Sequence, residues 1–249
     1  FGIPASISVP LVALLIWLLT MSGSFQRIEK ILLLVSCVFI AYVVAAFMAG
    51  PNWGEVTYAT VVPSVSSDPS YVSLVVATIG TTIAPWMIFL AQSNVVDKHA
   101  TEEDLTLQRI DAVSGSVTAD IIAWFIIITT GTVLFPAGIK IADAADAALA
   151  LEPIAGEFST VLFASGLVAA SFLAACVLPG VTSSAICEAF GWERGADRTW
   201  EEAPVYRGLI TGIVAVSAVL VLLPGVDLFQ IMMISQVING VLLPVVLVF

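Results

Sequence analysis

Long apolar stretches alternate with short polar stretches along the whole chain. Most of the apolar stretches have about 20 residues, enough for a helix rising about 1.5 Å per residue to cross a hydrocarbon core of about 30 Å. We therefore predict seven membrane-spanning helices. They are expected at residues 3–21, 31–48, 71–96, 113–135, 158–185, 208–223 and 228–249.

Composition supports the same interpretation. Apolar residues make up 59% of the 249 residues, charged residues make up 11%, and the mean hydropathy is +1.07. Soluble domains typically contain about 25% charged residues, so a lipid bilayer is the expected solvent. The chain is predicted to be an all-α integral membrane protein with a single transmembrane domain over residues 1–249.

The chain begins at Phe1 without an initiator Met and ends at Phe249, in both cases within an apolar stretch. We expect it to be a fragment of a longer protein. No basic region precedes the first apolar stretch, so no signal peptide is predicted there. The three cysteines, Cys37, Cys176 and Cys187, have irregular spacing and lie in or beside apolar stretches. Packing is therefore predicted for them, and not a disulfide framework or a zinc site.

Basic residues are concentrated in every second loop. The positive-inside rule places these loops in the cytoplasm, as expected for a multi-pass protein of a plasma or inner membrane. One side carries Arg27, Lys30, Lys98, Arg109, Arg194, Arg198 and Arg207, whereas the other side carries only Lys140.

The loops of the opposite side are acidic. Carboxylates at the mouth of a membrane protein raise the local concentration of cations, which favours a cationic substrate. The alternative is that these short loops are simply solvated and poor in lysine because of the topology. The acidic residues are Glu55, Asp68, Asp143, Asp146, Glu152, Glu157 and Asp227.

The third predicted span has an interior that should not remain helical. Pro85 cannot donate a backbone hydrogen bond, Gly80 is conformationally free, and three nearby threonines compete for backbone carbonyls. Carbonyls freed at membrane depth must face protein or a wet cavity, and transporters use such carbonyls to coordinate cations. The sequence therefore predicts an unwound cation site, with a simple proline kink as the alternative.

Two further spans carry polar groups. In the last span, Gln236 and Asn239 are three residues apart, so both amides can share one helix face. Gln236 is either an oxygen ligand facing the break or an interhelical hydrogen-bonding group. In the fourth span, Asp120 would cost about 2.5–3.5 kcal/mol at the lipid-facing centre. We expect it to face protein or water, either paired near the cytoplasmic interface or lining a route.

Five short motifs resemble the Nramp family of divalent metal transporters, and the resemblance covers essentially the whole chain. It implies a LeuT-type (APC superfamily) inverted-repeat fold, of which this chain covers family helices 4–10. The family's first and sixth helices are unwound around the substrate. The first, with its Asp-Pro-Gly-Asn motif, would precede this sequence. The motifs are Phe1-Gly2-Ile3-Pro4, Pro51-Asn52-Trp53-Gly54, Arg109-Ile110-Asp111, Leu151-Glu152-Pro153 and Ser235-Gln236-Val237.

The sixth helix departs from the family pattern. The family typically has Met-Pro-His-Asn, and this chain has Ala84, Pro85, Trp86 and Met87, so only the proline is retained. In the family the methionine is a thioether ligand that favours Mn²⁺ and Fe²⁺, and the histidine is tied to proton movement. The Thr81 carbonyl and the Gln236 amide match the family's oxygen ligands. Arg207 matches one of its ninth-helix arginines.

The resemblance thus implies a metal site at Thr81, Ala84 and Gln236. Pathway or gating roles are predicted for Trp86, Met87, Asp120, Arg207 and Asn239.

Loss of the sulfur ligand leaves a shell of oxygen atoms, which suits a hard cation such as Mg²⁺. This pattern resembles the Nramp-related magnesium transporters. The only histidine, His99, is predicted in a cytoplasmic loop, so the spans offer no imidazole as a proton relay. We expect uncoupled transport of Mg²⁺, and also of Mn²⁺. No resident cofactor, nucleic acid or obligate protein partner is expected.

Three alternatives remain open. One is a proton-coupled Mn²⁺ or Fe²⁺ symporter in which Met87 replaces the lost ligand. Another is an organic-solute carrier of the same fold, for example for amino acids, which the acidic mouth disfavours. A membrane enzyme or receptor is the third. The chain shows no Ser/His/Asp set, zinc spacing or phosphate-binding glycine loop, so we predict that it is not an enzyme.

Overall fold

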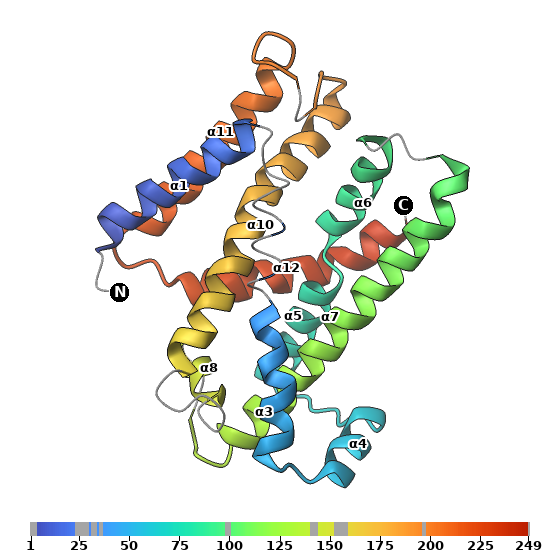
Figure 1. The fold of residues 1–249 in the computed structure, drawn as a ribbon, viewed down its shortest axis with the longest axis vertical. Helices are drawn as coiled ribbons and strands as arrows, with labels where there is room; N and C mark the ends of the chain where they lie inside the picture. Colours follow the sequence, from blue (N-terminus) through green and yellow to red (C-terminus); the bar gives the residue numbers. More distant parts are fainter. Residues whose placement is uncertain are drawn as a thin grey trace. The chain divides into compact units, whose positions relative to one another are not determined.

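The structure, a computed structural model, describes residues 4–22, 30, 34, 37–97, 101–139, 144–151, 159–195 and 198–248. Its regular elements in these residues are all helices, so the all-α prediction is confirmed (Figure 1). The elements are α1 (Ala5–Ser22), η1 (Cys37–Ile40), α3 (Ala41–Ala49), α4 (Trp53–Val61), α5 (Pro69–Thr82), α6 (Pro85–Asp97), η2 (Glu102–Asp104), α7 (Leu105–Val133), α8 (Ala144–Ala148), η3 (Leu149–Leu151), α10 (Ser159–Phe190), α11 (Pro204–Leu222) and α12 (Leu228–Val248).

Six helical stretches among the described residues are long and apolar enough to cross a membrane, with α5 and α6 together forming one of them. They correspond to six of the seven predicted spans. The remaining span, residues 31–48, is described at residue 34 and from Cys37, where η1 and α3 form a shorter apolar helix. That span stays a prediction.

Several helix ends differ from the predicted ones. Helix α7 begins at Leu105, eight residues before the apolar stretch, because a capping box between Thr101 and Asp104 starts the helix in polar sequence. Helix α4 lies in a stretch predicted as a loop, and the Asn52 side chain caps it by accepting the Gly54 N–H at 3.2 Å. Hydropathy locates the membrane-embedded part of a helix, not its full length.

The described residues form two compact units. The first contains Phe1–Glu29, Ser66–His99 and Phe172–Phe249. Within it, α1 and α11 lie side by side and antiparallel (Figure 1). The Trp17 indole N–H donates to Thr211 Oγ1 at 2.9 Å, and Arg207 Nη1 donates to the Met21 carbonyl at 3.2 Å. These two bonds join the same pair of helices one turn apart.

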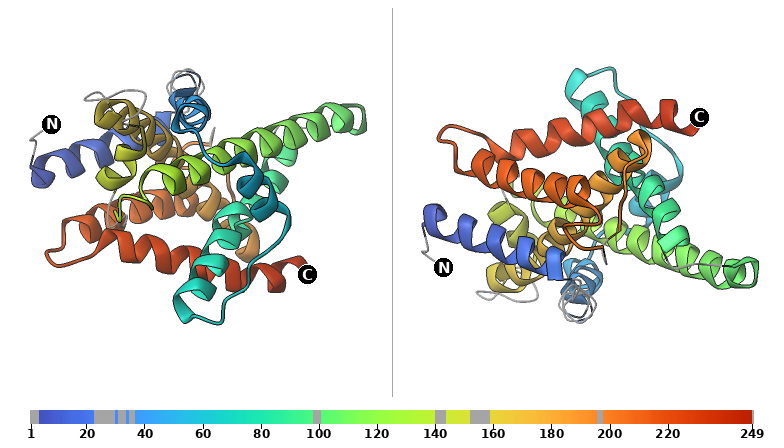
Figure 2. Two further views of the ribbon diagram at one scale, coloured as in Figure 1. Left: turned by 90° about the horizontal axis from the view of Figure 1, so that it is seen from below. Right: turned by 90° about the horizontal axis from the view of Figure 1, so that it is seen from above.

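The second unit contains Lys30–Val65 and Ala100–Ser171, and its longest helix is the 29-residue α7, green in Figure 2. The Thr129 hydroxyl on α7 donates to the Tyr42 carbonyl on α3 at 3.1 Å. The Trp124 indole N–H donates to Thr60 Oγ1 on α4 at 3.0 Å. The buried core of this second unit consists of Tyr42, Ala45, Leu134, Ala150 and Leu151.

Candidate metal-binding site

The third predicted span is broken. Helix α5 ends at Thr82 and α6 begins at Pro85, and Ile83 between them has φ −129° and ψ 81°, outside the helical region. The predicted unwinding before Pro85 is therefore confirmed. The break falls between two half-helices of 14 and 13 residues, so it lies near the middle of the span.

The break leaves backbone carbonyls without helical donors. The last bond of α5 runs from the Ile83 N–H to the Ile79 carbonyl at 3.0 Å. The Thr81 carbonyl would need an N–H at position 85, where proline has none. Among the described residues, no backbone N–H donates to the carbonyls of Gly80, Thr81 or Thr82. Three acceptors thus end α5, where the helix dipole carries partial negative charge that favours a cation.

Two of the three threonine hydroxyls near the break are engaged within the helix. Thr78 Oγ1 donates to the Leu74 carbonyl and Thr82 Oγ1 to the Thr78 carbonyl, both at 2.8 Å. These bonds are ordinary back-bonds of helical threonine. The break itself makes main-chain carbonyls available, beside the hydroxyl group of Thr81.

Helix α12 crosses α5 beside this break (Figure 1). A Cβ atom added to Gly80 would collide with the Gln236 carbonyl and the Gly240 nitrogen, so the two backbones are in direct contact. The Gln236 side chain is half-buried, and its Oε1 accepts the Asn239 amide at 3.3 Å. The structure thus brings Gln236 to Gly80 near the end of α5, with Asn239 hydrogen-bonded to the Gln236 side chain.

The residues that follow the break differ in exposure. Ala84 is only 2% exposed, and its methyl group carries no ligand atom. Trp86 is half-buried, whereas Met87, in the first turn of α6, is 38% exposed. No group of three or more His, Cys, Asp or Glu that could hold a metal occurs among the described residues. The ligand atoms available near the break are therefore carbonyl, amide and hydroxyl oxygens.

Two other predicted residues belong to helices other than α5, α6 and α12. Asp120 is exposed on α7, which belongs to the second unit. Arg207 lies in the first turn of α11 and donates through Nε to the Arg198 carbonyl at 2.6 Å and through Nη1 to the Met21 carbonyl. These contacts hold the ends of α1 and α11 together. A pathway role for Asp120 or Arg207 stays a prediction, and His99 lies outside the described residues.

The loop before α11 is also fixed locally. Glu202 accepts both the N–H and the hydroxyl of Thr199, at 2.7 and 3.0 Å. These two hydrogen bonds, helped by the nearby Arg198 and Arg207, hold the pKa of Glu202 below its ordinary value. Glu202 is therefore a charged group that fixes this turn at neutral pH.

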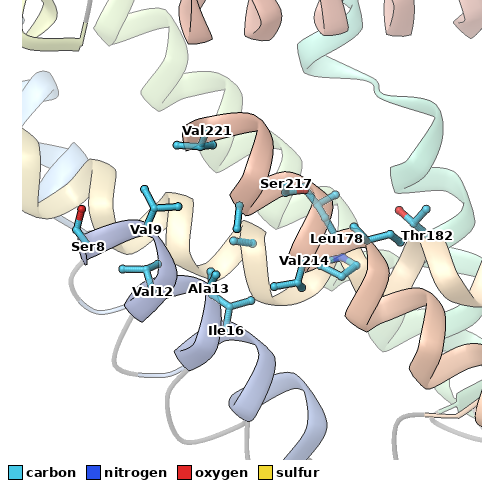
Figure 3. Close-up of a pocket in the computed structure, with 14 residues that line it drawn as sticks. Ser8, Val9, Val12, Ala13, Ile16, Leu178, Thr182, Val214, Ser217 and Val221 are labelled. Atoms are coloured by element: carbon cyan, nitrogen blue, oxygen red, sulfur yellow. The ribbon is translucent and has the colours of Figure 1, made fainter. Parts of the chain in front are cut away.

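An apolar pocket of about 500 Å³ lies between α1, α10 and α11 (Figure 3). Its walls include Ile16, Pro179 and Val214, and its polar side chains are only hydroxyls, those of Ser8, Thr182 and Ser217. A hydrated divalent cation needs several oxygen ligands or retained waters, which an apolar pocket does not supply. The pocket is therefore not the candidate metal site.

Sequence reasoning did not anticipate the contact between Gly80 and Gly240. The available signal was that each is the only glycine of its helix and that each lies within four residues of a predicted ligand, Thr81 or Gln236. Small residues at helix interfaces in membranes commonly mark close approach. Which glycines approach each other could not be read from one sequence.

Comparison with known proteins gives one family and two relatives. The family described as natural resistance-associated macrophage protein-like, or Nramp, matches residues 1–249. A protein named divalent metal cation transporter MntH from Caldanaerobacter subterraneus subsp. tengcongensis is 28% identical over 222 residues, which is 86% of this chain and 50% of the relative. A protein of the same name from Clostridium acetobutylicum is 25% identical over 212 residues, 82% of this chain and 46% of the relative. The chain spans about half the length of these relatives.

Proposed function

Because the chain belongs to the Nramp family, we propose that it forms part of a secondary transporter that carries divalent metal cations, chiefly Mg²⁺ and also Mn²⁺. The family has a LeuT-type fold, and the chain is a multi-pass integral membrane protein. Both relatives are named for the transport of divalent metal cations.

The observation that carries this proposal is the break between α5 and α6. Three carbonyls, those of Gly80, Thr81 and Thr82, have no backbone donor among the described residues, and Gln236 lies on the helix packed against them. Neutral carbonyl and amide oxygens at the negative end of a helix dipole are suitable ligands for a hard cation. The proposed metal ligands from this chain are the Thr81 carbonyl and the Gln236 amide.

The preference for Mg²⁺ follows from position 84. Ala84 provides no soft donor, so nothing at this position favours Mn²⁺ or Fe²⁺ over a harder ion. Mg²⁺ prefers oxygen in octahedral geometry and keeps several of its waters, so a few fixed protein oxygens are sufficient. Discrimination against Ca²⁺ would come from the size of the site.

Transport is proposed to be uncoupled from protons. The residue after Pro85 is Trp86, whose indole N–H is only a hydrogen-bond donor and does not take up and release protons at neutral pH. Downhill entry is feasible, since two charges moving through 100 mV gain about 4.6 kcal/mol, at about 2.3 kcal/mol for each charge. Asp120 is the candidate coupling group if proton movement is found.

We also propose an orientation for the protein in the membrane and the extent of its transmembrane domain. The loops that carry most of the Lys and Arg residues are assigned to the cytoplasm. Residues 1–249 are taken to belong to one transmembrane transporter domain.

One observation favours a second candidate, a proton-coupled Mn²⁺ or Fe²⁺ symporter. The side chain of Met87 is 38% exposed in the first turn of α6, and its thioether is a soft ligand. Met87 is three residues beyond Ala84, nearly a full helical turn, so it would have to reach back to the break.

The test is transport by the protein made from its complete gene and reconstituted in liposomes, with fluorescent readouts of internal metal and of pH. We expect saturable Mg²⁺ entry, slower Ca²⁺ entry, and no acidification linked to metal. Gln236→Leu should weaken the apparent Mg²⁺ affinity by about tenfold, as for loss of one supporting group at a metal site. Gln230→Leu, an exposed site on the same helix, is the matched control.

Each part of the proposal has its own contradicting result. Ca²⁺ entry as fast as Mg²⁺ entry would disprove the selectivity. Proton flux in proportion to metal flux would favour the symporter. If the Mg²⁺ affinity is unchanged in Gln236→Leu, the role of Gln236 is packing and not coordination.

A further inference from the structure

We propose that Gly80 and Gly240 are positioning residues that set the ion size accepted by the site, because they hold α12 in backbone contact with α5. The inference rests on the proposed function, since it concerns the same metal site. Neither glycine has a side chain that could contact the metal. Both act through the position of Gln236.

The contact is reciprocal. A Cβ atom on Gly80 would meet the Gln236 carbonyl, the Gly240 nitrogen and, at 3.0 Å, the Gly240 Cα. A Cβ atom on Gly240 would meet the Val76 carbonyl and, at 2.9 Å, Val76 Cγ1. Most of these atoms are main-chain atoms, which cannot rotate away as the end of a flexible side chain can. A methyl group at either glycine therefore fits only if the two helices separate.

The same contact fixes the distance across the site. Gly80 is the first of the three residues whose carbonyls have no backbone donor, and the atom opposite it belongs to Gln236. Gly240 follows Gln236 by one helical turn, so it lies on the same face of α12. Any separation of the helices at this crossing therefore moves the Gln236 amide away from the Thr81 carbonyl.

A wider site favours a larger ion. Mg²⁺ requires oxygen at about 2.0–2.1 Å with near-ideal geometry, whereas Ca²⁺ accepts about 2.3–2.6 Å and a flexible shell. Separation of α5 from α12 should therefore weaken Mg²⁺ binding more than Ca²⁺ binding. General damage to the fold would weaken both ions alike.

Other helical glycines of the chain provide matched controls. Gly212 on α11 and Gly115 on α7 have no atom within 4 Å of an added Cβ. Replacing either with Ala changes helix propensity in the same direction as replacing Gly80 or Gly240, without the collision.

The experiment measures Mg²⁺ and Ca²⁺ binding by calorimetry on purified protein made from the complete gene. The variants are Gly80→Ala and Gly240→Ala, with Gly212→Ala and Gly115→Ala as controls. We expect the ratio of Mg²⁺ to Ca²⁺ affinity to fall by about tenfold in the first two, equivalent to about 1.4 kcal/mol, and to stay unchanged in the controls. Thermal melting of each variant reports folding separately.

A rescue variant keeps the test decisive if Gly80→Ala or Gly240→Ala does not fold. Val76→Ala combined with Gly240→Ala removes the side-chain part of the collision, so its ratio of Mg²⁺ to Ca²⁺ affinity should fall below the wild-type ratio by less than about tenfold. Folded variants with the wild-type ratio, or with an equal loss for both ions, overturn the inference. If Gln236→Leu also leaves Mg²⁺ binding unchanged, the proposed site itself fails; if it weakens binding, only the role of the glycines is wrong.

Discussion

The stretch that contains α5 and α6 is broken, whereas helix α10 is continuous, although the two sequences are similar. Each is a membrane-spanning stretch with a proline in its interior, Pro85 in one and Pro179 in the other, and each has a glycine and several hydroxyl residues nearby. The first stretch separates into two helices before Pro85. The second passes through Pro179 and Gly180 as one helix of 32 residues.

The two stretches differ in what packs on the glycine. Gly80 has the backbone of α12 against it, whereas the nearest atom to a Cβ on Gly180 is the Tyr206 hydroxyl at 3.6 Å, an ordinary contact. Pro179 is buried and borders the apolar pocket. Proline removes one hydrogen bond in both helices. The comparison indicates that tertiary packing decides whether the helix then kinks or opens.

The largest effect is expected for Pro85→Ala. It restores an N–H that can bond to the Thr81 carbonyl, which lets α5 run into α6 and withdraws a proposed ligand. Mg²⁺ affinity should fall by about 100-fold, at the upper end for loss of a group that supports a metal site. Calorimetry on the purified variant measures this.

Pro179→Ala is the control for that prediction, since it restores a backbone N–H in a helix that is already continuous. Its Mg²⁺ affinity should match that of the wild type. Equal losses in the two variants would show that both prolines act through general stability, and the comparison would then be wrong.

A smaller effect is expected for Ala84→Met, and it is a change in which ion is preferred. A sulfur placed just before Pro85 gives the site a soft ligand, so preference should move from Mg²⁺ toward Mn²⁺ and Cd²⁺ by about tenfold, or about 1.4 kcal/mol. Competition binding with the three ions measures the change. Leu178→Met, directly before Pro179, is the matched control and should leave the preference unaltered. A uniform loss for all ions would mean that Ala84 serves only to let helices approach.

The smallest effect is expected for Thr81→Val. The proposed ligand is the main-chain carbonyl, which the substitution keeps, and valine has nearly the shape of threonine. Mg²⁺ affinity should change by less than about twofold, or about 0.4 kcal/mol. A tenfold loss would assign coordination to the hydroxyl group, and the break would then be less important than the threonines beside it.

Much of the fold could be predicted from the sequence because the bilayer imposes a fixed length on apolar helices. The break was also predictable, since Pro85 follows Gly80, Thr81 and Thr82 within one short segment. The start of α7 at Leu105 and the existence of α4 were not predicted. Local capping by Thr101 and Asn52 sets them, and hydropathy does not report capping.

The candidate site could be predicted only in part. Spacing placed Gln236 and Asn239 on one helix face, and the structure joins them by a hydrogen bond. The approach of Gly240 to Val76 depends on how two distant segments cross, which no local pattern encodes. Arg207 was singled out by family resemblance, and its contacts with Arg198 and Met21 depend equally on tertiary structure.

The two hydrogen bonds between α1 and α11 have a mechanical consequence. Trp17 pairs with Thr211 and Met21 with Arg207, so the bonds are one turn apart on both helices. Sliding one helix along the other by a turn, about 5.4 Å, would break both bonds at once. Small rotations that keep both bonds are also restricted, because two attachment points remove most hinge freedom. We therefore expect α1 and α11 to move together as one rigid pair in the proposed transporter, with relative motion at elements that fewer bonds join.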